Sequence, residues 1–65
     1  MTEVYENLKS GKTVAYYDLK GKTVFANFKD GVLFIKGKRG KVLSSLFYSD
    51  NSLLNFANAI KDCLA

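Results

Sequence analysis

The sequence predicts an α+β domain in which a four-stranded antiparallel β-meander is followed by a C-terminal α-helix. Glycines at positions 11, 21, 31, 37 and 40 mark the turns, and β-branched and aromatic residues fill the intervals between them. This pattern is typical of short strands joined by hairpins. Because the chain contains no proline, every interval remains suitable for the interior of a sheet. After residue 48 the apolar residues change to helical spacing.

The chain of 65 residues, of which 48% are hydrophobic, is expected to form one domain, 1–65. Its three parts are an N-terminal segment at 1–10, the meander at 13–48 and the helix at 50–64. In the N-terminal segment, Thr2 is suited to cap a short helix with Glu3 in its first turn. An extended edge strand is the alternative for this segment, and we favour the short helix.

The turn positions set the register of the predicted strands, which span 13–19, 22–29, 32–36 and 41–48. We expect two-residue turns at 20–21 and 30–31, and a third hairpin with a basic loop. Because side chains alternate between the two faces of a sheet, each turn also decides which face each residue occupies. The expected cross-strand pairs are Tyr16 with Phe25, Tyr17 with Val24, Phe28 with Leu33, Ala26 with Ile35, Asn27 with Phe34, and Lys36 with Lys41.

One face of the predicted sheet is mainly aliphatic, and the C-terminal helix is expected to pack on it. This face consists of Ala15, Tyr17, Leu19, Val24, Ala26, Phe28, Leu33, Ile35, Val42 and Leu46. The other face is aromatic and basic. It carries Tyr16, Phe25, Phe34, Leu43 and Phe47, with Lys29, Lys36 and Lys41 beside them.

The C-terminal segment is predicted to be an amphipathic helix. Ser49 or Asp50 is a suitable N-cap, since a side-chain oxygen at that position accepts a hydrogen bond from a free backbone N–H. An apolar stripe at helical spacing is expected to pack on the aliphatic sheet face and to bury the single cysteine. The stripe consists of Leu53, Phe56, Ala57, Ile60, Cys63 and Leu64.

The residue types present indicate neither catalysis nor metal binding. The chain has no histidine and its six carboxylates are dispersed, so the commonest general base and zinc ligand is missing. The Gly-Lys-Thr stretches at 11–13 and 21–23 lack the earlier glycine that a phosphate-binding loop requires. We therefore expect a protein that is not an enzyme and that uses no cofactor, metal or small-molecule substrate.

The expected compartment follows from cysteine content and hydropathy. A single cysteine cannot form an internal disulfide, and no apolar run approaches the ~20 residues of a membrane-spanning helix. The N-terminus is acidic, unlike that of a secretory signal. These features predict a cytoplasmic protein without membrane association.

Basic residues are concentrated in the middle of the chain. Residues 9–41 hold nine of the ten lysines and arginines but only Asp18 and Asp30 among the acids. Such a local surplus favours an anionic partner. The stretch Phe34 to Val42, FIKGKRGKV, is the most basic. It is either a contact for phosphate or a solvated hairpin tip without a binding role.

The aromatic face admits three explanations, since a soluble monomer does not normally leave so large an apolar patch bare. The N-terminal segment could fold over it, or a second copy of the chain could cover it in a homodimer. In the third explanation, nucleic-acid bases stack on its rings while neighbouring lysines hold phosphates. The last two explanations are compatible if the two sheets pair only partly.

Two stretches resemble the positive cofactor four family of small single-stranded-DNA-binding transcriptional coactivators. They are Val14 to Lys22, VAYYDLKGK, and Gly37 to Ser45, GKRGKVLSS. With the helix included, the resemblance covers residues 14–62. It implies a β-β-β-β-α fold, a dimer, a role in transcription regulation, and DNA-backbone contacts by basic residues of the hairpins and sheet. In this chain those residues are Lys20, Lys22, Lys38, Arg39 and Lys41.

The function that we predict is sequence-independent binding of nucleic acid, DNA or RNA, by a homodimer that prefers single strands. The alternative is a small protein-binding regulator or inhibitor, of the kind encoded by mobile elements or viruses, that uses the aromatic face or the helix. For nucleic acid, the expected phosphate contacts are Lys20, Lys22, Lys36, Lys38, Arg39 and Lys41, and the expected stacking residues are Tyr16, Phe25 and Phe34.

Overall fold

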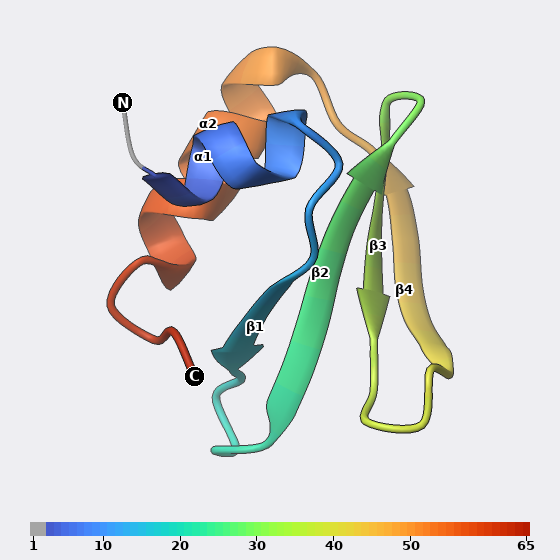
Figure 1. Cartoon of the computed structure of the whole chain (residues 1–65), viewed down its shortest axis with the longest axis vertical. Coiled ribbons are helices and arrows are strands. Elements are labelled where there is room, and N and C mark those ends of the chain that lie inside the picture. Colours follow the sequence, from blue (N-terminus) through green and yellow to red (C-terminus); the bar gives the residue numbers. More distant parts are fainter. Residues whose placement is uncertain (1–2) are drawn as a thin grey trace.

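The computed structural model describes residues 3–65 and confirms the predicted α+β class. The strands form one antiparallel sheet in the order β1-β2-β3-β4, so the meander is also confirmed (Figure 1). Within the described residues, neither helix is long and apolar enough to cross a membrane. In chain order the elements are α1 (Glu3–Lys9), β1 (Val14–Tyr17), β2 (Thr23–Lys29), β3 (Val32–Lys36), β4 (Val42–Phe47) and α2 (Asp50–Ile60).

The short N-terminal helix predicted from the sequence is present as α1. Its first turn carries Glu3 and Glu6, whose charges suit the positive end of the helix dipole. The predicted cap, Thr2, lies outside the described residues. After the helix, Gly11 has a φ of +86° and donates its N–H to the carbonyl oxygen of Leu8 at 3.1 Å. A left-handed residue at this place ends the helix and turns the chain toward β1.

The helix α2 begins as predicted. Ser49 is its N-cap, and the Oγ of Ser49 accepts a hydrogen bond from the N–H of Ser52 at 3.2 Å. Leu53, Ala57 and Ile60 of the predicted stripe are buried. The spacing of these three residues places them on one side of the helix, which packs on the sheet.

The C-terminal residues differ from the prediction. The helix ends at Ile60, and residues 63–65 run beside the outer edge of β1, where the N–H of Tyr17 donates to the Cys63 carbonyl oxygen at 2.8 Å. The expectations that the helix continues to residue 64 and that it buries Cys63 are therefore wrong, and the Cys63 side chain is exposed. Pairing with the β1 backbone replaces the last helical turn.

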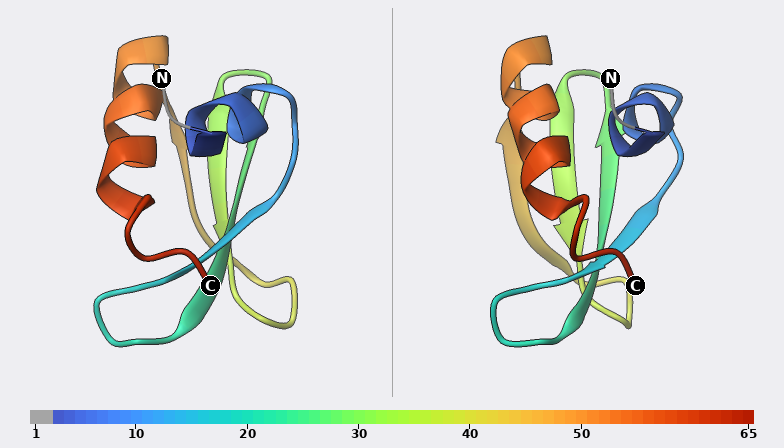
Figure 2. Two further views of the ribbon diagram at one scale, coloured as in Figure 1. Left: turned by 60° about the vertical axis from the view of Figure 1, so that its left-hand side comes forward. Right: turned by 90° about the vertical axis from the view of Figure 1, so that its left-hand side faces the viewer.

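Both helices lie on the same face of the sheet (Figure 2), and the core lies between them and the sheet. Leu8 of α1 and Leu53 of α2 are fully buried in one cluster with side chains from β1, β2 and β3. Since α1 contributes to this core, the interpretation in which the N-terminal segment covers the opposite face is wrong for residues 3–10. The buried residues are Val4, Leu8, Val14, Tyr16, Val24, Ala26, Leu33, Leu53, Ala57 and Ile60.

The middle hairpin has the predicted register across its two-residue turn at 30–31. The first hairpin does not, because Tyr16 lies opposite Val24 and not opposite Phe25. A shift of one residue moves every side chain of a strand to the other face. Tyr16 consequently joins the core, and Tyr17 lies on the face without helices.

Asp18 is the reason for this shift. Its Oδ1 accepts hydrogen bonds from the backbone N–H groups of Lys20 and Lys22, at 2.8 and 2.9 Å. The N–H of Asp18 in turn donates to the Lys22 carbonyl oxygen at 2.9 Å. The turn is therefore a three-residue loop, 19–21, that ends in Gly21 with a φ of +77°, and the expected two-residue turn is wrong.

The third hairpin is also shifted from the expected register, and it contains a β-bulge. Lys36 lies opposite Val42 instead of Lys41. Beyond this pair the register changes by one residue, which leaves Leu43 as the extra residue of the bulge. Val42 therefore shares a face with Lys36, opposite to the face predicted for it.

Candidate functional site

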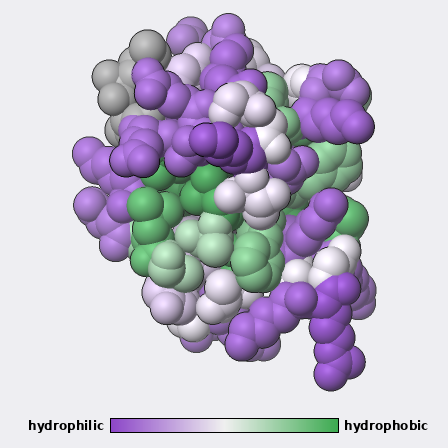
Figure 3. Space-filling model, viewed as in Figure 1, coloured by the Kyte–Doolittle hydropathy of each residue, from purple (hydrophilic) through white to green (hydrophobic). Residues whose placement is uncertain are grey.

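The two basic hairpins turn at the same end of the sheet, because alternate turns of a meander lie at the same end (Figure 1). The first tip spans residues 18–22 and the second spans 37–41. Hydrophilic groups project from this lower end of the molecule in Figure 3. The structure thus brings all six predicted phosphate contacts to one place, which we call the basic end: Lys20, Lys22, Lys36, Lys38, Arg39 and Lys41.

Both tips have the same backbone hydrogen bonds, which close a three-residue loop at a glycine. The N–H of Gly21 donates to the Asp18 carbonyl oxygen at 2.9 Å, and the N–H of Gly40 donates to the Gly37 carbonyl oxygen at 3.0 Å. Gly21 and Gly40 have φ angles of +77° and +78°, a conformation that other residues adopt only at a cost. A lysine follows each glycine, so the shared turn places a cation at the matching position of each tip.

We expect Gly40→Ala to destabilise the protein, whereas Gly37→Ala should leave its stability almost unchanged. A Cβ added at Gly40 meets no atom within 4 Å, so the cost comes from the left-handed backbone alone and amounts to about 1–2 kcal/mol. At Gly37 no such φ is required, and the added Cβ makes an ordinary contact with Leu43 at 3.8 Å. Urea unfolding followed by far-UV circular dichroism compares the variants, and equal midpoints would contradict this turn geometry.

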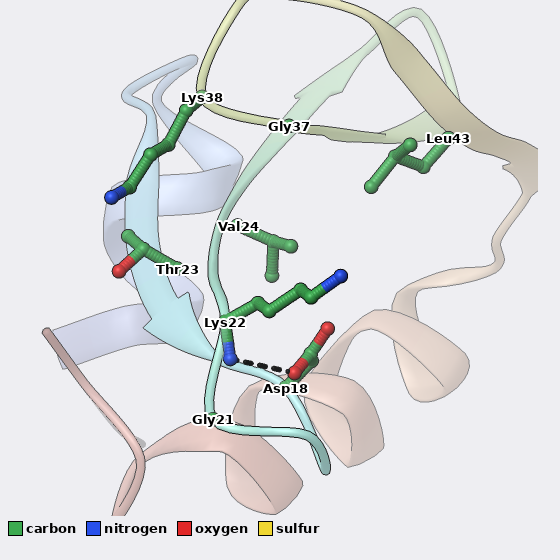
Figure 4. A pocket seen from close by; sticks show the side chains of 8 residues that line it. All are labelled: Asp18, Gly21, Lys22, Thr23, Val24, Gly37, Lys38 and Leu43. Carbon is green, nitrogen blue, oxygen red and sulfur yellow. Dashed lines mark hydrogen bonds between the residues drawn. The ribbon is translucent and has the colours of Figure 1, made fainter.

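A cleft of about 560 Å³ opens between the two tips. Its lining combines the apolar side chains of Val24 and Leu43 with the side chains of Lys22 and Lys38 (Figure 4). In this view Lys22 extends toward Val24 and Leu43, whereas Lys38 extends away from them, on the side of Thr23. The two cations therefore flank the cleft from different sides.

The basic end has a surplus of positive charge. The carboxylate of Asp18, the acidic residue in its first tip, is engaged by N–H groups of the turn. Across residues 3–65 the one ion pair joins Lys9 of α1 to Asp50 of α2 at 2.7 Å, where hydrogen bonding to Asp50 raises the pKa of Lys9. No cation of the basic end thus has a carboxylate partner in this part of the chain, and an incoming anion displaces no existing ion pair.

The face without helices, which we call the open face, carries aromatic rings beside the basic end. Phe25 lies directly opposite Lys36 on the neighbouring strand, so a ring and an ammonium group are adjacent on this face. Phe25 and Phe34 are half-buried, whereas Tyr17 and Phe47 on the outer strands are more exposed. These four rings come from all four strands of the sheet.

Tyr16, which the sequence predicts to be a stacking residue, does not belong to the open face. Its side chain is 9% exposed and packs edge-on against Phe56 of α2, with the ring centroids 5.8 Å apart. Burial raises the pKa of the Tyr16 phenol. The hypothesis that Tyr16 stacks a base is therefore wrong. Tyr17 takes this place, and the signal that could have revealed it is the Asp-x-x-Gly pattern of the turn that begins at Asp18.

Comparison of the chain with protein-family models, with curated proteins and with solved structures finds no match. The resemblance to the positive cofactor four family therefore stays a prediction. The basic end and the open face are the features from which a function can be inferred.

Proposed function

We propose that this protein binds single-stranded nucleic acid without reading its sequence. The observation that carries the proposal is that six cations converge on one end of a sheet whose open face presents aromatic rings. None of these cations has a carboxylate partner among residues 3–65. Cations neutralise backbone phosphates, and aromatic rings stack bases of any identity. The combination binds a single strand irrespective of its sequence.

The arrangement of the two features suits an extended strand that runs from the basic end onto the open face. Phosphates meet Lys22 and Lys38 on either side of the cleft. Further along, Lys36 and Phe25 are neighbours across β2 and β3, so one nucleotide can present its phosphate to the ammonium group and its base to the ring. Stacked and paired bases of a duplex offer no free faces to such a surface, which favours single strands.

The test is anisotropy titration of the protein with labelled single-stranded DNA and RNA oligonucleotides at low salt. We expect Lys38→Glu plus Arg39→Glu to weaken binding by more than about tenfold, because two phosphate contacts become repulsive. The matched control, Lys12→Glu plus Lys29→Glu, makes the same change in net charge at the opposite end of the sheet. It should weaken binding much less.

A second arm of this experiment addresses stacking. Phe34→Leu keeps an apolar side chain and removes the ring, so it should cost about 1–3 kcal/mol of binding free energy if one base stacks there. Undetectable binding by the wild-type chain would overturn the proposal. Equal losses in the tip variant and its control would also overturn it, because general charge would then explain the affinity.

A protein partner is the second candidate, and the exposed rings of Tyr17 and Phe47 favour it. Aromatic residues are enriched in protein–protein interfaces. In this candidate the protein is a small regulator or inhibitor that uses the open face, and the basic end plays no part. Binding of that kind changes little with salt, whereas binding through phosphate contacts changes steeply.

A further inference from the structure

The two edges of the sheet differ in how they are covered. At β1, the N–H of Ala65 donates to the Ala15 carbonyl oxygen at 3.1 Å, next to the bond between Tyr17 and Cys63, so residues 63–65 pair with this edge. At β4, no backbone hydrogen bond reaches any segment other than β3 within residues 3–65. One edge is therefore closed, and the other is free to pair with another strand.

The strand β4 also lacks most of the devices that protect an edge strand. Val42–Phe47 contains no charged residue and no proline, and all of its residues are exposed. Neither helix covers it, since Leu46, on the helix-bearing face, is 58% exposed, and Phe47, on the open face, is 86% exposed. The bulge at Leu43 lies near the tip, so residues 44–47 form a regular segment with apolar groups on both faces.

We infer that β4 pairs antiparallel with β4 of a second copy of this chain, so that two four-stranded sheets join into one continuous sheet. The twofold axis of such a pair is perpendicular to the sheet, so both helical layers lie on one side and both open faces on the other. Leu46 of each copy then lies between the two helical layers, and Phe47 of each copy adds to the joined open face. The inference goes beyond the nucleic-acid proposal and does not depend on it.

The charge distribution favours the antiparallel arrangement over a parallel one. In an antiparallel pair the tip that carries Lys41 lies beside the far end of the second β4, which leads into Asp50 of the second copy. The two basic tips are then about 20 Å apart, the length of a six-residue strand. This separation exceeds the screening length of roughly 8 Å at physiological salt. A parallel pair would place the two tips side by side, where their like charges repel.

The same features explain why the pairing includes two copies and no more. A domain of this size has a small stability margin, so the burial of the exposed apolar side chains of β4 in both copies is favourable. The other edge of the four-stranded sheet, at β1, is already paired with residues 63–65. The twofold contact uses the free edge of each copy, and it closes the assembly as a dimer.

Sedimentation velocity over a concentration series, without nucleic acid, tests the pairing. We expect the wild-type chain to form a dimer and both Ser45→Lys and Ser45→Asp to remain monomers, since the twofold axis brings each new charge close to its own counterpart. Mixing the two variants should restore the dimer, because the new charges are then opposite. Asn55→Lys and Asn55→Asp, at an exposed position of α2, are matched controls and should stay dimeric.

The wild-type and variant measurements decide the question independently. Ser45 is exposed, so neither substitution disturbs the core, and far-UV circular dichroism verifies the fold of each variant. A wild-type chain that stays monomeric at the highest concentration overturns the inference. A dimer that survives both Ser45 substitutions also overturns it, because the contact then lies elsewhere. Neither outcome bears on the nucleic-acid proposal, since no oligonucleotide is present.

Discussion

Leu53→Ala should leave the domain largely unfolded at room temperature. Leu53 is fully buried where α2 meets the sheet, in one cluster with Leu8 of α1. Its truncation is expected to lower the free energy of unfolding by about 2–5 kcal/mol, through lost burial and the cavity that remains. Because a core of this size rarely supplies more than about 3–5 kcal/mol in total, the loss is comparable with the whole stability of the domain.

Urea unfolding monitored by far-UV circular dichroism measures this loss. Leu19→Ala is the matched control, since it removes the same atoms from a side chain that is fully exposed at the first hairpin tip. It should change the free energy of unfolding by less than about 0.5 kcal/mol. If the two variants unfolded at the same urea concentration, Leu53 would not lie at the centre of the core.

The fold class and the middle hairpin could be predicted because their signals are local. Asp30 and Gly31 adopt φ angles of +52° and +78°, and an Asp-Gly pair supplies both of these left-handed positions at little cost. The N-cap at Ser49 is a signal of the same kind, because the capping oxygen needs only the backbone of the next three residues.

The face of β1 could not be predicted from the apolar pattern alone. Tyr16 and Tyr17 are the same residue type, so the sequence VAYY fits either register, and the decision comes from the carboxylate of Asp18. A similar ambiguity affects β4, where apolar residues point to both faces and the bulge at Leu43 leaves no strict alternation. The pairing of residues 63–65 with β1 depends on contacts distant in sequence, which no local pattern reveals.

The register error affects the two parts of the candidate site, the basic end and the open face, differently. A register shift of one residue does not move a hairpin tip from one end of the sheet to the other, so the placement of the six basic residues at one end is insensitive to it. The same shift exchanges the two faces of a strand, and it therefore replaces Tyr16 by Tyr17 on the open face. Predicted phosphate contacts in such a fold are thus safer than predicted stacking residues.

Raising the salt concentration from about 50 to about 200 mM should weaken oligonucleotide binding by roughly 250-fold. The physical reason is counterion release, since each phosphate that a cation neutralises frees condensed ions from the nucleic acid. Six contacts with a single strand give a slope of about −4 for the logarithm of the affinity against the logarithm of salt concentration. Anisotropy titrations at four or five salt concentrations measure this slope.

The slope also separates the contribution of the basic end from that of the rings. Lys38→Gln plus Arg39→Gln removes two of the six contacts, so the slope should become shallower by about 1.4. Phe34→Leu should lower the affinity by a similar factor at every salt concentration and leave the slope unchanged, because stacking releases no counterions. A slope near zero, with measurable affinity, would show that the cations hold no phosphates and that binding depends on the apolar side chains of the open face.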